Sequence, residues 1–136
     1  MNTLPTSAAE RKAIPLVSGV LDYFPNALAG VAQCSVAGNE QHQPGEPLHW
    51  ARGKSSDHAD ALARHLVDRD TVDKDGIPHV FKIAWRALAL AEEYCEAQGA
   101  IPGRASKFSS DAVGPCSPWP RQYPDERHPV INSKPE

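Results

Sequence analysis

The chain has 136 residues, a length that suits one domain with short extensions. It carries 14 Lys and Arg residues against 17 Asp and Glu residues, which gives a formal net charge of −3. Because polyanion binding needs a basic surface, this balance excludes a protein that coats nucleic acids in general. No apolar run approaches the roughly 20 residues that span a bilayer, and the first residues lack the pattern of a secretory signal. We therefore expect a cytoplasmic protein with no membrane partner, whose three cysteines are reduced thiols.

Proline separates the two ends of the chain from its body. Seven of the 13 prolines lie beyond residue 100, a density that no helix or central strand tolerates. The sequence therefore predicts an extended, proline-rich arm over residues 101–136, in which Trp119 and Tyr123 would dock onto the body or a neighbouring subunit. Residues 1–12 are predicted to be a flexible N-terminus, which leaves residues 13–100 as the folded domain.

Helical spacing of apolar residues predicts three main helices in this body. The first spans about residues 25–39 and begins at a proline that suits a first helical turn. The second spans about residues 56–69, behind a serine cap. The third spans about residues 79–98 and carries the strongest periodic pattern of the chain. Its apolar stripe consists of Val80, Ile83, Ala84, Ala87, Leu88, Ala91 and Tyr94.

These patterns predict an all-α fold, a small helical bundle with three main helices and an extended C-terminal arm. No useful stretch alternates with period two, as a half-buried strand would. Three short helices bury only a modest core, and for that reason we expect a homo-oligomer. Near the end of the third helix, Glu92, Glu93 and Glu96 are expected to form a solvated face.

The second helix carries two histidines beside an aspartate. His58 and His65 are seven residues apart and share one helix face, and Asp68 follows His65 by three residues. An imidazole next to a carboxylate can hold a divalent metal or transfer a proton. The alternative is a solvated surface pair or a satisfied interior histidine, which would carry no chemistry.

The third helix begins with a cationic edge. His79, Lys82 and Arg86 lie at helical spacing on one face, and their neighbours are apolar. Cations near a helix N-terminus form a natural anion site, and arginine adds a planar fork that matches phosphate. The alternative is that the two long side chains cover apolar surface with their stems and keep their charges in water.

The loop before the second helix carries an aromatic ring next to a cation. Trp50 would stack on a nucleobase, a contact worth about 1–3 kcal/mol in single-stranded recognition, and Arg52 offers a further cation for phosphate. The alternative is that Trp50 closes the end of the bundle and that Arg52 is exposed to solvent.

Taken in order, the motifs are a Trp-Ala-Arg-Gly loop, an Arg-His helix, an acidic linker that contains Asp-Gly, and a helix that begins with histidine. The residues that carry them are Trp50, Gly53, Arg64, His65, Asp73, Asp75, Gly76 and His79. Over roughly residues 11–96, this order resembles a phage and prophage family, the N-terminal domain of dATP/dGTP diphosphohydrolases. The chain departs from the family pattern at two positions, where Lys82 replaces a second histidine and Arg86 replaces an asparagine.

The resemblance implies a phage-type protein that binds a purine (deoxy)nucleotide. If the chain is also an enzyme, it would hydrolyse this nucleotide with a divalent metal, Mg²⁺, Mn²⁺ or Co²⁺. The implied metal ligands are His65, Asp73, Asp75 and His79. The candidate catalytic residues are His65 and His79, which match the family motifs, together with Asp68, which is chosen for its helical spacing to His65. The candidates for phosphate binding are Arg52, Arg64, Lys82 and Arg86, with Trp50 as the base-stacking ring.

Two other functions stay open at this point. The departures at Lys82 and Arg86 place cations that repel a divalent ion and attract phosphate oxygens, which weakens the case for hydrolysis. The chain would then sequester a purine nucleotide or a nucleotide second messenger of host anti-phage defence, without a cofactor. The third interpretation is a structural helical protein that only makes protein contacts.

Overall fold

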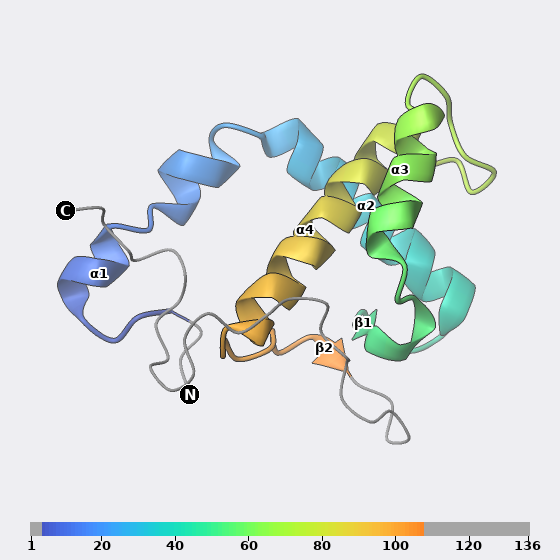
Figure 1. The fold of residues 1–136 in the computed structure, drawn as a ribbon. Coiled ribbons are helices and arrows are strands. Elements are labelled where there is room, and N and C mark those ends of the chain that lie inside the picture. Colours follow the sequence, from blue (N-terminus) through green and yellow to red (C-terminus); the bar gives the residue numbers. More distant parts are fainter. Residues whose placement is uncertain (1–3, 108–136) are drawn as a thin grey trace.

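The computed structural model describes residues 4–107, which form a helical body (Figure 1). In chain order the elements are α1 (Ala8–Lys12), a π-helical turn η1 (Val17–Leu21), α2 (Pro25–His42), β1 (Trp50–Ala51), a 3-10 turn η2 (Arg52–Lys54), α3 (His58–Val67), α4 (His79–Ala97) and β2 (Ser106–Lys107). The all-α prediction with three main helices is confirmed. Most of the predicted arm, from residue 108 onward, lies outside the described residues. At the other end, the segment predicted to be a flexible N-terminus contains α1.

Helix α4 holds the body together because both other long helices pack against it. In Figure 1, α3 runs beside α4, and α2 crosses behind them. The approach of α2 depends on Gly30, because a Cβ atom there would lie only 2.4 Å from the ring of Phe81. A few residues along the same helices, the indole Nε1 of Trp85 donates a hydrogen bond of 3.0 Å to the hydroxyl of Ser35.

The buried interior of this body is small and unusually polar. Among residues 4–107, the buried apolar side chains are Ala61, Ala89 and Ala97. The buried polar residues are Asn39, His58, His79 and Gln98. Because buried polar groups need partners that fix their geometry, this composition ties the packing of α3 against α4 to specific contacts between imidazole, carboxylate and guanidinium groups.

A two-stranded parallel sheet joins β2, which follows α4, to β1, which lies in the loop before α3. Trp50 lies opposite Ser106 and Ala51 lies opposite Lys107, and the amide of Trp50 donates to the carbonyl of Ala105 at 2.8 Å. This pair leaves the all-α class unchanged, because each strand has only two residues. A pair of two-residue strands is too short to produce an alternating pattern in the sequence, and only the fold brings the two segments together.

The N-terminal part of the body exposes apolar side chains. Leu16, Val17, Val20, Leu21, Tyr23 and Phe24 are all exposed, and Figure 1 shows α1 and η1 to one side, away from α3. Within the described part of the chain, no single helix is long and apolar enough to cross a membrane. Residues 8–21 and 25–42 reach those limits only when counted together, and they meet at 89°.

Candidate functional site

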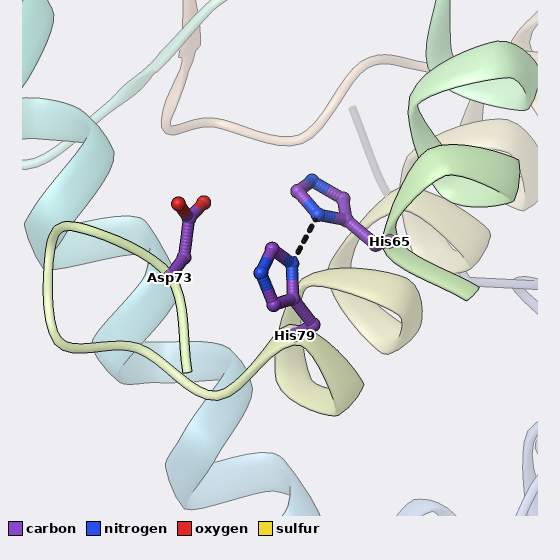
Figure 2. A group of neighbouring side chains, drawn as sticks. All are labelled: His65, Asp73 and His79. Carbon is purple, nitrogen blue, oxygen red and sulfur yellow. Dashed lines mark hydrogen bonds between the residues drawn. The ribbon is translucent and has the colours of Figure 1, made fainter. Parts of the chain in front are cut away.

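Two histidines and an aspartate meet where α3 ends and α4 begins. We call His65, Asp73 and His79 the imidazole–carboxylate cluster (Figure 2). His65 lies in the last turn of α3, His79 is the first residue of α4, and Asp73 belongs to the linker between them. The linker folds back because Gly76 adopts a φ of 81°, a left-handed conformation that glycine takes without strain.

The donor atoms of this cluster converge on one another. The two Nδ1 atoms of His65 and His79 are 2.8 Å apart, and one ligand atom from each of the three residues lies within 4.8 Å of the others. Figure 2 shows the side chain of Asp73 next to the ring of His79. Since at most one proton fits between the two facing nitrogens, at least one of them presents a lone pair.

The surroundings keep His65 and Asp73 in the protonation states that bind cations. Burial lowers the pKa of His65, and the nearby His79, Lys82 and Arg86 lower it further. Hydrogen bonding from Lys82, followed by the amide of Lys74, lowers the pKa of Asp73 to about 2. At neutral pH the cluster therefore contains neutral His65 and an ionised carboxylate, both of which are metal-ligand forms.

Lys82 joins the cluster to the rest of the linker. Its Nζ lies 2.6 Å from Oδ2 of Asp73 and 2.6 Å from Oδ2 of Asp75. Burial opposes the charge of Lys82, but hydrogen bonds to the two carboxylates outweigh it and raise the pKa of this lysine. The structure thus places Asp75 against the ammonium group of Lys82, while Asp73 contacts that group and also approaches the two imidazoles.

A second group of side chains lies between α3, α4 and the loop that carries β1. We call Trp50, His58, Trp85 and Arg86 the tryptophan cluster. The Trp50 ring is edge-on to Trp85 at 5.5 Å and to His58 at 5.9 Å between centroids. Nη1 of Arg86 donates to Nδ1 of His58 at 2.9 Å and to the hydroxyl of Ser55 at 2.8 Å. These contacts hold the guanidinium group of Arg86 on the side of α4 that faces α3.

His58 is the most enclosed member of the tryptophan cluster, with 2% of its surface exposed. Because Nδ1 accepts from Arg86, the neutral ring carries its proton on Nε2, which lies 3.4 Å from Oε1 of Glu93. Burial lowers the pKa of His58, although the charge of Glu93 opposes that effect. The structure therefore favours a neutral imidazole at this position.

Arg52 and Glu96 form a buried ion pair next to the tryptophan cluster. The guanidinium group of Arg52 pairs with Glu96, donates to the hydroxyl of Ser106 and lies 3.5 Å from the centroid of a Trp50 ring. Burial raises the pKa of Glu96, while Arg52 opposes that shift. The expectation of a solvated face is therefore wrong for Glu96, and for Glu93 beside His58. One sequence pattern indicates this burial: Glu93 and Glu96 lie at helical spacing from Ala89, on the face of α4 where Ala89 is buried.

Two predicted site residues lie apart from these clusters. Arg64 pairs with Asp57 at 2.7 Å near the start of α3, and both side chains are exposed. Asp68 is the residue that follows the last turn of α3, and its carbonyl oxygen accepts from the amide and the hydroxyl of Thr71. The structure thus brings His65, Asp73 and His79 together and leaves Arg64 and Asp68 outside that group.

Comparison with known protein families adds a relationship to this geometry. A family model described as dATP/dGTP diphosphohydrolase, N-terminal, matches residues 5–100, which contain the whole imidazole–carboxylate cluster. The chain belongs to this family. Membership in the dATP/dGTP diphosphohydrolase family relates the chain to enzymes that hydrolyse nucleotides and confirms the resemblance seen in the motif order. Neither the curated proteins nor the solved structures contain a match.

Proposed function

We propose that this domain binds a purine deoxynucleoside triphosphate and hydrolyses it with the help of a divalent metal held by the imidazole–carboxylate cluster. The observation that carries this proposal is the convergence of donor atoms from His65, Asp73 and His79 within 4.8 Å. Membership in a family described as dATP/dGTP diphosphohydrolase, N-terminal, supports the choice of dATP or dGTP as the substrate. The donor set favours Mn²⁺ or Co²⁺ over Mg²⁺, because imidazole nitrogen suits transition metals and Mg²⁺ prefers oxygen and water.

The fit of an ion to these residues rests on their number and their charge state. Two nitrogens and one carboxylate make three protein ligands, which leaves coordination positions for water and a phosphate oxygen. Such an ion would polarise the phosphate and lower the pKa of a bound water. Lys82 follows His79 by one turn of α4 and contacts Asp73, so its charge lies beside this cluster, where it would attract a phosphate group.

Turnover is the direct test of this function. We expect dATP or dGTP to be consumed with Mn²⁺ or Co²⁺ and not after chelation, with the products separated by ion-exchange chromatography. His65→Ala and His79→Ala should each lower kcat by at least about a hundredfold. His42→Ala is the matched control, because His42 is exposed at the end of α2 and lies outside both clusters. Equal turnover in all three variants would contradict the proposal.

A second candidate function is nucleotide capture without hydrolysis, and the position of Lys82 favours it. Its ammonium group already supplies a positive charge to Asp73 and Asp75, and a cation so close to the cluster opposes a divalent ion while it attracts phosphate. The ligand would then be a purine nucleotide or a nucleotide second messenger. Recovery of intact dATP or dGTP from the heat-denatured protein after incubation with metal would support capture over hydrolysis.

A further inference from the structure

Lys82 is a largely enclosed lysine whose charge is held between two carboxylates. Its Nζ lies 2.6 Å from Oδ2 of Asp73 and 2.6 Å from Oδ2 of Asp75, and 17% of its side chain is exposed. A lysine that only covers apolar surface with its stem keeps its ammonium group in water. The ammonium group of Lys82 is instead turned toward the linker, where it meets both carboxylates.

The linker fixes these two carboxylates through its own backbone. Oδ1 of Asp73 accepts from the amide of Lys74 at 2.7 Å, and Oδ1 of Asp75 accepts from the amide of Ile77 at 3.1 Å. Each carboxylate therefore has one oxygen tied to the backbone and turns the other, Oδ2, to the same point. Because two carboxylates repel each other, this convergence needs a cation, and Lys82 supplies it.

Asp73 belongs to this position and to the imidazole–carboxylate cluster at the same time. One of its ligand atoms lies within 4.8 Å of ligand atoms of His65 and His79, while its Oδ2 contacts Lys82. An ionised carboxylate has about four lone-pair sites, so Asp73 can coordinate an ion and accept from the ammonium group together. Its carboxylate thus lies between two neighbouring cation positions, one lined by the imidazoles and one filled by Lys82.

This arrangement parallels a two-metal site with one ion replaced by an ammonium group. In two-metal sites, divalent ions about 3.5–4 Å apart clamp the attacking and leaving oxygens of a phosphoryl group. Lysine and Mg²⁺ both serve as clamps on a transferring phosphoryl group, so one can take the place of the other. A fixed ammonium group also repels a divalent ion that approaches the same two carboxylates.

We infer that Lys82 is a built-in second cation: its ammonium group occupies the position of the second ion of a two-metal site, so the chain takes one divalent ion, in the imidazole–carboxylate cluster. The inference rests on the proposed function and deepens it, because it assigns the number of ions and the role of the lysine. In the proposed hydrolysis, Lys82 supplies the second positive charge beside the phosphate groups without a second metal.

The test is the number of Mn²⁺ ions that the full chain binds, measured by equilibrium dialysis and by electron paramagnetic resonance. We expect one ion for the wild type and one more for Lys82→Ala, because loss of the ammonium group leaves the two carboxylates to an ion. The additional ion should be spin-coupled to the first across Asp73, whereas the wild type should show an isolated ion. Lys74→Ala is the matched control, since it removes an exposed charge from the same linker and should leave the number unchanged.

Further variants locate the additional ion. The double variant Lys82→Ala/Asp75→Asn should return to the wild-type number, because Asp75 contacts Lys82 and is not one of the three residues of the imidazole–carboxylate cluster. Lys82→Arg keeps the charge and should also keep the wild-type number. If circular dichroism shows that Lys82→Ala does not fold, Lys82→Gln keeps a polar side chain without the charge and should gain the same ion.

The difference between Lys82→Ala and the wild type tests the inference, whereas the wild-type number tests the proposed function. Two ions in the wild type, or no additional ion in the folded variant, would overturn the inference and leave the proposed function intact. An additional ion that persists in the double variant would lie elsewhere and would also overturn it. A wild type that binds no ion would contradict the proposed function, and a gain of one ion in Lys82→Ala would then still support the role of Lys82.

Discussion

The imidazole–carboxylate cluster and the tryptophan cluster lie along the same interface between α3 and α4, and they are built from the same kinds of residue. Each contains a histidine from α3, His65 or His58, and each has a cation from α4, Lys82 or Arg86. They differ in what their polar atoms face. In the first, the ligand atoms of three residues point toward one another, whereas in the second the cation donates to a ring nitrogen and a hydroxyl of its own chain.

This difference assigns separate roles to the two clusters. Polar groups with fixed partners in a buried place stabilise one packing arrangement; in the tryptophan cluster this holds for Arg86 and for Nδ1 of His58, whereas Nε2 of His58 is buried without a hydrogen bond. Donor atoms that converge at the end of the helix pair, next to a turn, are available to a ligand. Their lone pairs repel one another, and the packing of the surrounding residues holds them in place. We therefore expect variants of the tryptophan cluster and the adjoining Arg52–Glu96 pair to change stability, and variants of the imidazole–carboxylate cluster to change ligand binding.

The largest effect on stability should come from the buried ion pair. Glu96→Ala leaves the guanidinium group of Arg52 buried without its carboxylate, and breaking such a pair costs about 3–5 kcal/mol. The free energy of unfolding from urea denaturation measures this loss. Glu92→Ala, one turn earlier on α4, is the control and should cost much less. A loss below about 1 kcal/mol for Glu96→Ala would place this pair among solvated surface contacts.

The next effect concerns acid sensitivity. Because burial lowers the pKa of His58 below its ordinary value of about 6.5, protonation favours the unfolded chain. Stability is therefore full above that pH and is lost as the pH falls through the lower folded-state pKa, by about 1.4 kcal/mol for each tenfold loss of proton affinity. His58→Gln should flatten the change in unfolding free energy between pH 7.5 and pH 5, while His42→Gln should not. A slope unchanged by His58→Gln would show that this imidazole titrates normally.

A smaller effect should distinguish the imidazole–carboxylate cluster. Lys82→Met removes the positive charge beside Asp73, and we expect the affinity for Mn²⁺ or Co²⁺ to rise about tenfold. Isothermal titration calorimetry measures the affinity directly, and Lys74→Met in the same linker serves as the control. A fall in affinity would mean that Lys82 acts mainly by holding Asp73 and the linker in position.

The smallest effect should come from the exposed pair at the start of α3. The side chain of Arg64 is 64% exposed, and solvent screens an ion pair of this kind. Arg64→Ala should leave the urea midpoint within experimental error and should not change metal binding. A clear shift in either quantity would extend the functional site to this end of α3.

Local sequence patterns predicted the helices well because helix formation depends on neighbours in the chain. The predicted start of α2 at Pro25 and the span of α4 agree with the structure within three residues. The predicted association of His65 with His79 and Asp73 came from motif order, and a short linker between two packed helices brings those residues together. By contrast, Arg52 and Glu96 are 44 residues apart, and no local sequence pattern predicts that they form a pair.

By itself, the sequence determined that the chain forms three amphipathic helices, which residues can carry a positive or negative charge, and which family it belongs to. The tertiary structure decided which charges neutralise one another, that Lys82 lies between two carboxylates, and that Val80 and Leu88, on the apolar stripe of α4, are exposed. The physical reason is that helix periodicity is set by contacts three and four residues apart, whereas the partner of a charge or an apolar face is set by how the helices pack.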